Sequence, residues 1–329
     1  MTLDLSFFQR LQIATPQNAW AAILDAAWTT CSARFAGNSP GTEIVGRDRI
    51  VGEIDFFMAT SAWDLWKAYE EVVPLGSDRL VAWWREQEDG KAVLILDAFS
   101  LRESPWLLVG AESRGFKIHD ARAVGAELPA DTTPFAKALG FSQRSALSNN
   151  GGGGKHRLSG ARTESADISW DDCSSLVGSE PNWVFWHQWF DNHLHEHSTP
   201  GSGLPFLAKE AEAHLASDGF WRFIERLATG RRVVITADHG YAASGDFPDS
   251  SKEQTEYLRN IFRNGRWSVG ENEAGPWVPP LDLHLETRHG SYLFVNGRRK
   301  WKSAGGYPTL THGGLSVLEV AVPWIEISK

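Results

Sequence analysis

The sequence predicts an α/β fold in which a mainly parallel sheet is sandwiched by helices. Residues 92–96 and the run RVVITA at 232–237 are short, continuous and apolar, as strands buried on both faces of a parallel sheet are. From residue 91 onward such runs alternate with amphipathic helical segments, including the one at 205–227. This alternation is typical of strand–helix–strand units with right-handed crossovers, which build a parallel sheet.

Residues 1–90 lack this alternation and are predicted to be helical. Thr15 precedes a proline, which is the pattern of an N-cap followed by the first helical residue. Ser61 with Asp64 resembles a capping box, and a third helix is expected to begin at Asp78. We expect this segment to be an N-terminal extension that covers an edge or face of the sheet, with docking of a partner as the alternative.

Composition indicates a globular protein. The 329 residues, 42% hydrophobic and 22% charged, are enough for one large domain at 91–329 plus the extension. Cys31 and Cys173 are the only cysteines and lack a Cys-x-x-Cys spacing, which argues against a disulfide framework or a zinc–thiolate site. No apolar run approaches the ~20 residues of a membrane helix, and the amino terminus lacks the pattern of a secretory leader. We therefore expect a cytoplasmic protein without membrane association.

Metal-ligand side chains follow both predicted strands. Asp97 directly follows the first strand, and Asp238 and His239 follow the second. Because the carboxyl ends of parallel strands meet at one edge of a sheet, these side chains are expected to lie together. Carboxylate oxygens and neutral imidazoles bind the same divalent cations, which indicates a metal site. The alternative is that Asp238 caps a turn and His239 is a surface histidine.

Two further segments offer ligands of the same kinds. Asp191 and His195 are four residues apart, so a helix would place both on one face. His193 and His197 are alternatives to His195 in this histidine-rich segment. His312 is followed by two glycines, which let the backbone turn tightly and hold this side chain in a rigid loop.

The order of these segments resembles a known family. Strand-Asp, Asp-x-x-x-His, strand-Asp-His-Gly and a late His-Gly-Gly are similar to the alkaline phosphatase superfamily of two-metal phosphoryl and sulfuryl transferases, and HGGLSVLEVAVP at 312–323 looks like its PglZ branch. The resemblance covers roughly residues 91–329. It implies one cation held by two Asp and a His, and a second held by an Asp and two His. The implied ligands are Asp97, Asp238 and His239 for the first cation, and Asp191, His195 and His312 for the second.

The resemblance also implies a threonine or serine nucleophile shortly after the first Asp. Pro129-x-x-Thr132-x-Pro134 is similar to the pattern of the phosphodiesterase members, which points to Thr132. Pro134 is tolerated only in a first helical turn, whose free amides and positive dipole end favour a phosphate. Thr133 and Ser100 are the alternative nucleophiles, and Thr132 can also be a plain N-cap.

This site predicts a substrate class. Two divalent cations would activate the hydroxyl. With three carboxylates they would leave the centre about one charge positive, so it would bind an anionic phosphate ester even though the net charge of the chain is -9. Mixed Asp and His ligands suit Zn²⁺ best, with Mn²⁺ or Mg²⁺ as alternatives. We recognise no arginine beside Thr132 to hold a doubly charged monoester, so phosphodiesters are expected. The PglZ branch implies nucleotides or oligonucleotides as substrates, and a bacterial defence or signalling system with protein partners.

A second class of function stays open. The fold can serve as a non-catalytic, metal-bearing scaffold or binding module of a phage-defence (BREX-type) complex. Six ligand residues in the expected order argue against that role, because a scaffold has no need for paired metal chemistry. Sulfatase activity is disfavoured, since the sulfatase pattern needs a modifiable Cys or Ser at the position of Thr132.

Three residues outside the ligand set are candidate substrate contacts. Lys155 and Arg157 lie in the glycine-rich loop at 149–160, which is too polar and too rich in glycine to be expected to pack. They can clamp a phosphate backbone, or they can belong to a solvated charge cluster. His289 precedes a glycine and is either a substrate contact or an ordinary loop residue.

Aromatic residues and one long insertion complete the prediction. Residues 241–277 follow the metal edge and suit a lid that selects the substrate. Trp183, Trp186, Trp189 and Trp106 lie close to the ligands in sequence. They can stack on a nucleobase, or they can be core residues beside the strands.

Overall fold

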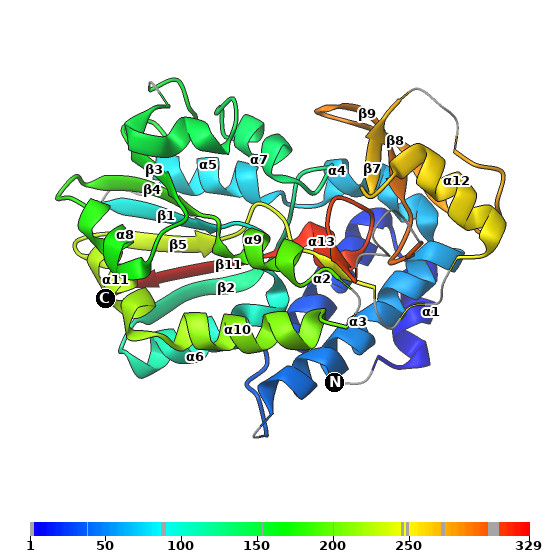
Figure 1. Ribbon diagram of the computed structural model, residues 1–329, viewed down its shortest axis with the longest axis horizontal. Helices are drawn as coiled ribbons and strands as arrows, with labels where there is room; N and C mark the ends of the chain where they lie inside the picture. Colours follow the sequence, from blue (N-terminus) through cyan, green and yellow to red (C-terminus); the bar gives the residue numbers. More distant parts are fainter. Residues whose placement is uncertain are drawn as a thin grey trace.

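A six-stranded sheet forms the centre of the protein in the computed structural model (Figure 1). The structure describes residues 3–37, 39–86, 90–152, 154–199, 201–244, 247, 250–270, 274–301 and 309–329. The strands lie in the order β2 (Lys117–Gly125), β11 (Ala321–Ser328), β5 (Arg232–Thr236), β1 (Lys91–Leu96), β4 (Asn182–His187) and β3 (Arg162–Ala166). β5, β1, β4 and β3 are parallel, whereas β11 runs antiparallel to its neighbours β5 and β2. The predicted α/β class with a mainly parallel sheet is confirmed.

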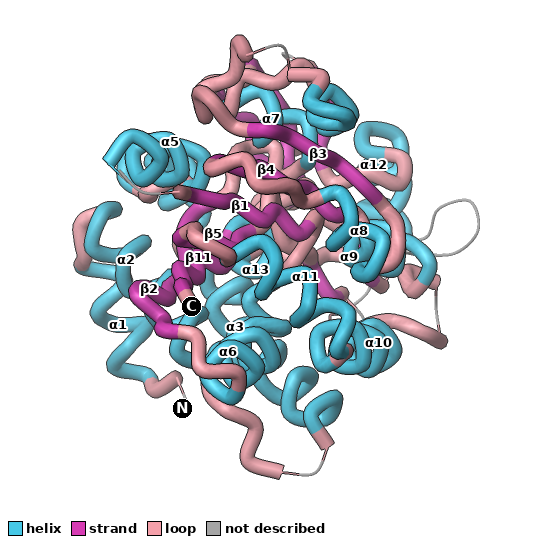
Figure 2. The backbone as a smooth tube through the Cα atoms, turned by 90° about the vertical axis from the view of Figure 1, so that its left-hand side faces the viewer, coloured by secondary structure: helices cyan, strands magenta, loops and turns pink. Residues whose placement is uncertain are grey.

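Helices cover both faces of this sheet, as the end-on view in Figure 2 shows. One face carries α2 (Pro16–Ser32) and α5 (Gly76–Glu86). The other face carries α6 (Ser104–Ser113), α8 (Trp170–Leu176), α10 (Leu204–Ala216) and α11 (Asp218–Ala228). The segment predicted as helical at 205–227 is divided between α10 and α11, because Ser217 accepts a hydrogen bond from the Phe220 amide and caps α11.

The described residues up to 86 are mainly helical, as expected. They form α1 (Leu5–Ile13), α2, α3 (Pro40–Ser61), the 3₁₀ helix η1 (Trp63–Ala68), α4 (Tyr69–Val72) and α5. Thr15 caps α2, with Pro16 in its first turn. The expected capping box at Ser61 and Asp64 was wrong, since Ser61 is the last residue of α3.

The N-terminal helices share their core with the sheet. Trp20 and Tyr69 belong to the same buried hydrophobic cluster as the residues of β1 and β5. The Tyr69 hydroxyl donates to the carbonyl oxygens of Ala126 (3.0 Å) and Val320 (3.2 Å), which lie far along the chain. The boundary at residue 90 remains a prediction, but the packing of the two segments is continuous.

A smaller sheet lies beside the carboxyl ends of the parallel strands (Figure 1). It has the order β7 (Trp267–Val269), β9 (Gly290–Val295) and β8 (Asp282–Thr287), and all its pairs are antiparallel. The expected lid at 241–277 contributes β6 (Ala242–Ala243), α12 (Lys252–Phe262) and β7 to this region, while 245–246, 248–249 and 271–273 lie outside the described residues. Strand β6 pairs with β10 (Leu310–Thr311).

The glycine-rich segment is more ordered than the sequence suggested. His156 and Leu158 are buried, with the His156 ring stacked on Phe141 at 4.7 Å, and residue 153 lies outside the described part. β3 follows directly and was missed, because RTESA has neither an apolar run nor a regular alternation. The expectation that this segment does not pack was therefore wrong.

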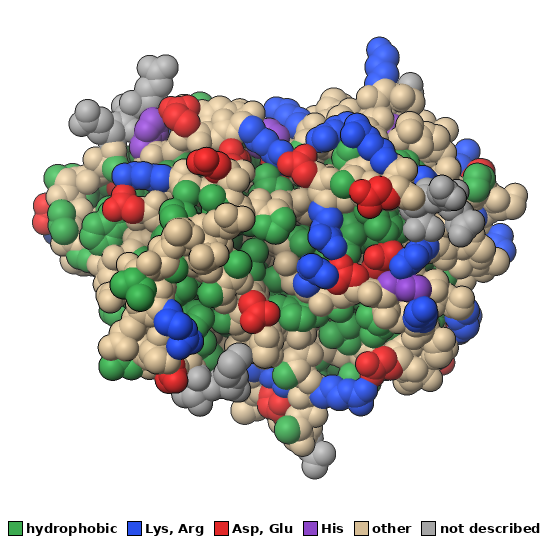
Figure 3. All heavy atoms as spheres, turned by 180° about the vertical axis from the view of Figure 1, so that it is seen from behind, with side chains coloured by type: hydrophobic (Ala, Val, Ile, Leu, Met, Phe, Trp, Pro, Cys, Tyr) green, Lys and Arg blue, Asp and Glu red, His purple; other side chains and the backbone are tan. Residues whose placement is uncertain are grey.

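Charged side chains are mixed on the surface. Figure 3 shows basic and acidic groups interspersed on the face seen from behind. The negative net charge is therefore not gathered into one acidic field on this face. Among the described residues, none of the helices has the length and apolar character that crossing a membrane requires.

Candidate metal centre

The three ligands expected for the first cation lie together at the carboxyl edge of the sheet. Asp97 follows β1, and Asp238 and His239 follow the adjacent parallel strand β5, so the strand pairing brings them to one place. All three side chains are buried. His239 Nε2 lies 3.7 Å from Asp97 Oδ1 and 3.5 Å from Asp238 Oδ2. The other Asp238 oxygen, Oδ1, accepts a hydrogen bond from the Ala98 amide (3.0 Å), which fixes this carboxylate.

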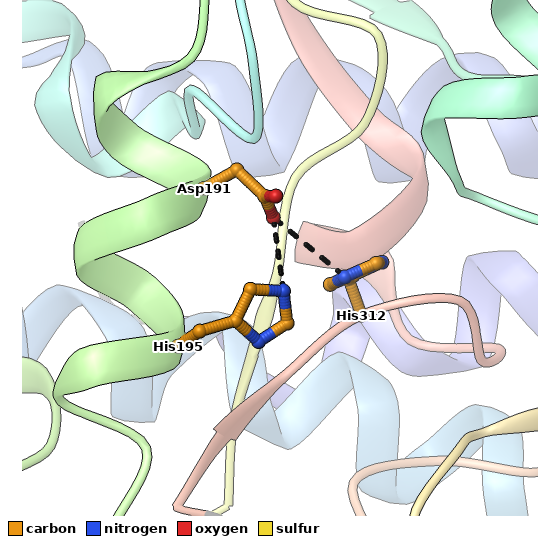
Figure 4. A group of neighbouring side chains, drawn as sticks. All are labelled: Asp191, His195 and His312. Carbon is orange, nitrogen blue, oxygen red and sulfur yellow. Dashed lines mark ion pairs between the residues drawn. The ribbon is translucent and has the colours of Figure 1, made fainter. Parts of the chain in front are cut away.

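The three ligands expected for the second cation also converge (Figure 4). Asp191 and His195 lie on α9 (Trp189–Glu196), where their spacing places His195 Nε2 3.4 Å from Asp191 Oδ1. His312 follows β10 and points its Nε2 at the same oxygen from 3.7 Å. Gly313 supports this turn with a φ of +98°, a conformation that glycine adopts without steric cost.

The two groups meet at Asp191. Ligand atoms within 4.8 Å of one another define two sets in the described part of the chain: Asp191, His195 and His312, and Asp97, Asp191 and His239. Asp191 therefore belongs to both sets, whereas the resemblance had assigned it to the second cation alone. Asp238 Oδ2 lies 3.5 Å from His239 Nε2, but Asp238 is not a member of the set formed by Asp97, Asp191 and His239. The His239 and His312 rings stack at 4.2 Å, so the two sets are neighbours.

The residues present fit a pair of divalent cations. Asp191 Oδ1, Asp238 Oδ2 and His239 Nε2 are buried and have no hydrogen-bond partner among the described residues. Buried polar atoms without a partner are costly and rare. Oxygen and imidazole nitrogen atoms that share one small space are what cations of the zinc type coordinate.

The electrostatics of the cluster favour positive charge. Burial, followed by the neighbouring carboxylates of Asp238 and Asp191, raises the pKa of Asp97 well above its usual value. Burial by itself lowers the pKa of His239, but the Asp238, Asp97 and Asp191 charges outweigh it and raise this pKa to about 9. Burial would raise the pKa of Asp191, but the adjacent His195 and His312 hold it below its ordinary value. A bound cation would stabilise the ionised form of these three neighbouring carboxylates.

Arg144 and Trp186 orient Asp97 through contacts that no local sequence pattern indicates. Asp97 Oδ2 accepts hydrogen bonds from Trp186 Nε1 (3.0 Å) and from the guanidinium of Arg144, which begins the 3₁₀ helix η3 (Arg144–Asn150). The other oxygen, Oδ1, therefore faces His239 and Thr132. Groups that hydrogen-bond to a metal ligand fix its orientation in this way.

Removal of either orienting group should weaken metal binding. We expect Trp186→Phe and Arg144→Met to lower the metal affinity about 10–100-fold, since Asp97 would lose a fixed orientation. Equilibrium dialysis of the purified variants against Zn²⁺ measures this. Trp183→Phe is the matched control, because Trp183 is an equally buried neighbour in β4 whose indole nitrogen has no partner among the described residues. Equal affinities for Trp186→Phe and the control would contradict the assigned role.

The nucleophile expected from the sequence lies beside this centre. Thr132 is the first residue of α7 (Thr132–Ala138), and its hydroxyl donates to Asp97 Oδ1 at 3.3 Å. Asp131 occupies the N-cap position, so Thr132 is not the cap itself. Of the alternatives, Thr133 is exposed, and Ser100 is buried in the capping box of η2 (Leu101–Glu103). Because α7 has only seven residues, the argument for Thr132 rests on its contact with Asp97 and not on the helix N-terminus.

The remaining candidates lie in other contacts. His289 Nε2 is 2.8 Å from Glu127 Oε2, and Arg157 donates to the Ala138 carbonyl (2.9 Å). Lys155 is exposed. The role of all three as substrate contacts therefore remains a proposal. Among the described residues, none of the three contacts one of the six candidate ligands.

The alternatives to His195 are engaged elsewhere. The His193 ring stacks on Trp189 at 4.0 Å, and His197 Nε2 lies 2.8 Å from Glu210. Among the described residues, His195 is the one of these three histidines that forms an ion pair with Asp191.

The tryptophans proposed for base stacking are packing residues. Trp183 and Trp186 are buried, with 1% and 0% of their surface exposed, and no base can reach them. Both faces of Trp189 are covered, by His193 at 4.0 Å and by His214 at 3.9 Å. Trp106 packs on Phe35 at 5.2 Å. The interpretation of these residues as core is the one that the packing supports.

The fold and the family comparison together define an alkaline phosphatase-like protein. The chain belongs to the PglZ family: residues 155–327, more than half of the chain, match the model of the BREX system PglZ alkaline phosphatase-like domain. The resemblance stated from the sequence is confirmed. No curated protein matches the chain by sequence.

Two solved structures are similar in outline. Murine ectonucleotide pyrophosphatase/phosphodiesterase 5 is 11% identical, with 73% of this chain and 88% of that chain covered and a TM-score of 0.44. Phosphonoacetate hydrolase from Sinorhizobium meliloti 1021, in complex with phosphonoformate, is 13% identical, with 72% and 89% covered and a TM-score of 0.41. At these values neither structure bears on the chemistry of this chain.

Proposed function

We propose that this protein is a metal-dependent hydrolase of phosphoric esters with Thr132 as its nucleophile. The observation that carries the proposal is the 3.3 Å hydrogen bond from the Thr132 hydroxyl to Asp97 Oδ1, the same oxygen that faces His239. A hydroxyl and a set of metal ligands are thereby brought together at the edge of a parallel sheet. Membership of an alkaline phosphatase-like family supports this chemistry.

Each residue has a defined part in the reaction. Two divalent cations, when bound, would lower the pKa of the hydroxyl and stabilise negative charge on the phosphate oxygens. The six ligand residues named above would hold them. Thr132 Oγ1 attacks the phosphorus while the bond to the leaving oxygen breaks. The hydroxyl proton passes to Asp97 Oδ1, which accepts its hydrogen bond, and the leaving alkoxide takes a proton from water. Water then cleaves the Thr132 phosphoester and regenerates the hydroxyl.

Zinc is the proposed cation, because half of the six ligands are imidazoles, with Mn²⁺ and Mg²⁺ as alternatives. Diesters, including nucleotides or oligonucleotides, are the proposed substrates. One premise from the sequence was wrong, since Arg144 does lie beside Asp97 and Thr132. Its guanidinium is paired with Asp97 and neutralises that carboxylate, so it does not serve as an extra positive charge for a doubly charged monoester. Singly charged diesters therefore remain the proposed substrates.

A scaffold in a phage-defence complex is the second candidate. The family model is described as a BREX system domain. Leu5, Ile13 and Phe56 on α1 and α3 have 73%, 87% and 61% of their surface exposed, as apolar side chains at an interface with a partner would. A scaffold would bind cations without turnover.

Metal content and turnover test the two candidates together. We expect two zinc ions per chain by elemental analysis, and two anomalous-scattering peaks about 4 Å apart between the ligands. Hydrolysis of bis-p-nitrophenyl phosphate should exceed that of p-nitrophenyl phosphate. Because Asp191 belongs to both ligand sets, Asp191→Asn should reduce binding of both ions, whereas Asp171→Asn on the exposed side of α8 should not. A single peak, or a fully loaded protein without turnover, would argue against the hydrolase.

A further inference from the structure

We propose that Trp267 and Tyr292 form a subsite that stacks a flat ring of the substrate, such as a nucleobase, next to the nucleophile. The proposal rests on the proposed function and specifies its substrate class. It concerns residues of the smaller sheet: β7 lies in the expected lid at 241–277, and β9 had no role assigned from the sequence. Of the tryptophans first considered for stacking, Trp183, Trp186 and Trp189 are covered, and Trp106 packs on Phe35.

Trp267 lies between the nucleophile and a metal ligand. Its indole Nε1 donates to Asp131 Oδ2 at 3.1 Å, and Asp131 directly precedes Thr132. On the other side, a Cβ added to Gly313 would come within 2.6 Å of the indole Cδ1. The ring therefore lies against the backbone that follows His312. These two contacts place the indole at the wall of the candidate metal centre.

Trp267 is held rigidly in this position. The preceding residue, Arg266, is buried and donates to both carboxylate oxygens of Glu319, at 2.7 and 3.1 Å. Glu319 also accepts from the Gly314 amide at 2.8 Å, so the strand carrying Trp267 and the loop carrying His312 are tied to one carboxylate. A stacking surface that is already ordered loses little conformational entropy when a ligand binds.

Tyr292 completes the subsite. Its ring centroid lies 5.4 Å from that of Trp267 at an interplanar angle of 87°, and its hydroxyl donates to the His289 carbonyl at 3.1 Å. Both rings are half-buried, so each retains surface for a ligand. An aromatic face binds any nucleobase, because every base has a π face, and this selects nucleotide esters without selecting a base.

The Trp267 indole has a second role that the test must separate from stacking. It positions Asp131 through a hydrogen bond, which a phenylalanine side chain cannot make. Phenylalanine does keep an aromatic face. Trp267→Phe therefore removes the hydrogen bond and retains a stacking surface, whereas Trp267→Ala removes both.

Calorimetry with three ligands tests the proposal. Zinc-loaded protein with Thr132→Ala, which prevents turnover, is titrated with adenosine 5′-monophosphate, ribose 5-phosphate and inorganic phosphate. We expect the nucleotide to bind roughly tenfold or more tightly than the sugar phosphate, as stacking of one base allows. Adding Trp267→Ala should abolish this difference and leave phosphate affinity unchanged, while Trp267→Phe should retain most of it. Tyr292→Leu should reduce it and provides a second variant if Trp267→Ala does not fold.

Trp277 provides the control for this titration. Trp277→Ala removes another half-buried tryptophan of the same region, which packs on Tyr257 at 4.4 Å, and should leave all three affinities unchanged. Equal weakening of all three ligands by Trp267→Ala would show a structural role and overturn the subsite. Equal affinities for nucleotide and sugar phosphate in the parent would also overturn it, with the proposed hydrolase intact. Failure of the zinc-loaded parent to bind any of the three would overturn the proposed function as well.

Discussion

Replacing Thr132 by alanine is expected to lower kcat by at least about 1000-fold, with metal content unchanged. The substitution removes the oxygen that attacks phosphorus and leaves all six ligands in place. The structure adds a reason, because this hydroxyl donates to Asp97 at 3.3 Å and thus lies next to the proposed cations. Steady-state hydrolysis of bis-p-nitrophenyl phosphate, with zinc content measured on the same samples, checks this.

Three further substitutions test the choice of this threonine. Thr133→Ala should cost little, because Thr133 is exposed. Thr132→Ser should retain partial activity, since only the methyl group that restricts the rotamer is lost. Ser100→Ala should act on stability through its capping box and leave the chemistry intact. Near-normal turnover of Thr132→Ala, or loss of turnover in Thr133→Ala or Ser100→Ala, would move the nucleophile.

Replacing Arg298 by methionine is expected to lower the free energy of unfolding by about 3–5 kcal/mol. Arg298 is buried and donates to both oxygens of Asp48, at 2.8 and 2.7 Å, and to Asp55 at 2.6 Å. Burial already raises the pKa of Asp55, and Arg298 is the charge that opposes this. Without it, Asp55 is a buried carboxylate lacking a counter-charge. Denaturant unfolding of the variant measures the loss.

An exposed ion pair provides the matched control. Arg222→Met removes the partner of Asp171, where both side chains are more than half exposed, and should leave the free energy of unfolding nearly unchanged. If Arg298→Met were as stable as this control, the buried network would not hold the fold. Because Asp48 and Asp55 lie on α3 and Arg298 follows β9, the expected loss would also show that this contact between α3 and the region of the smaller sheet stabilises the fold.

Local patterns in the sequence indicated the fold class and the candidate ligand residues. The strands β1 and β5 were recognisable because strands buried on both faces are continuous apolar runs, and Asp97, Asp238 and His239 follow them directly. Asp191 and His195 were linked by helical spacing alone. β3 was missed because its residues are polar, so the period that marks a strand is absent.

Only the tertiary structure decided how these residues are partnered. The pairing of Arg144 with Asp97 joins residues 47 apart in the chain, and that of Trp267 with Asp131 joins residues 136 apart. The place of Asp191 in both ligand sets likewise follows from where α9 lies relative to β1 and β5. A single sequence records which side chains follow a strand or share a helical face, because those relations are local. Contacts between distant segments depend on how the whole core packs, and no local period encodes them.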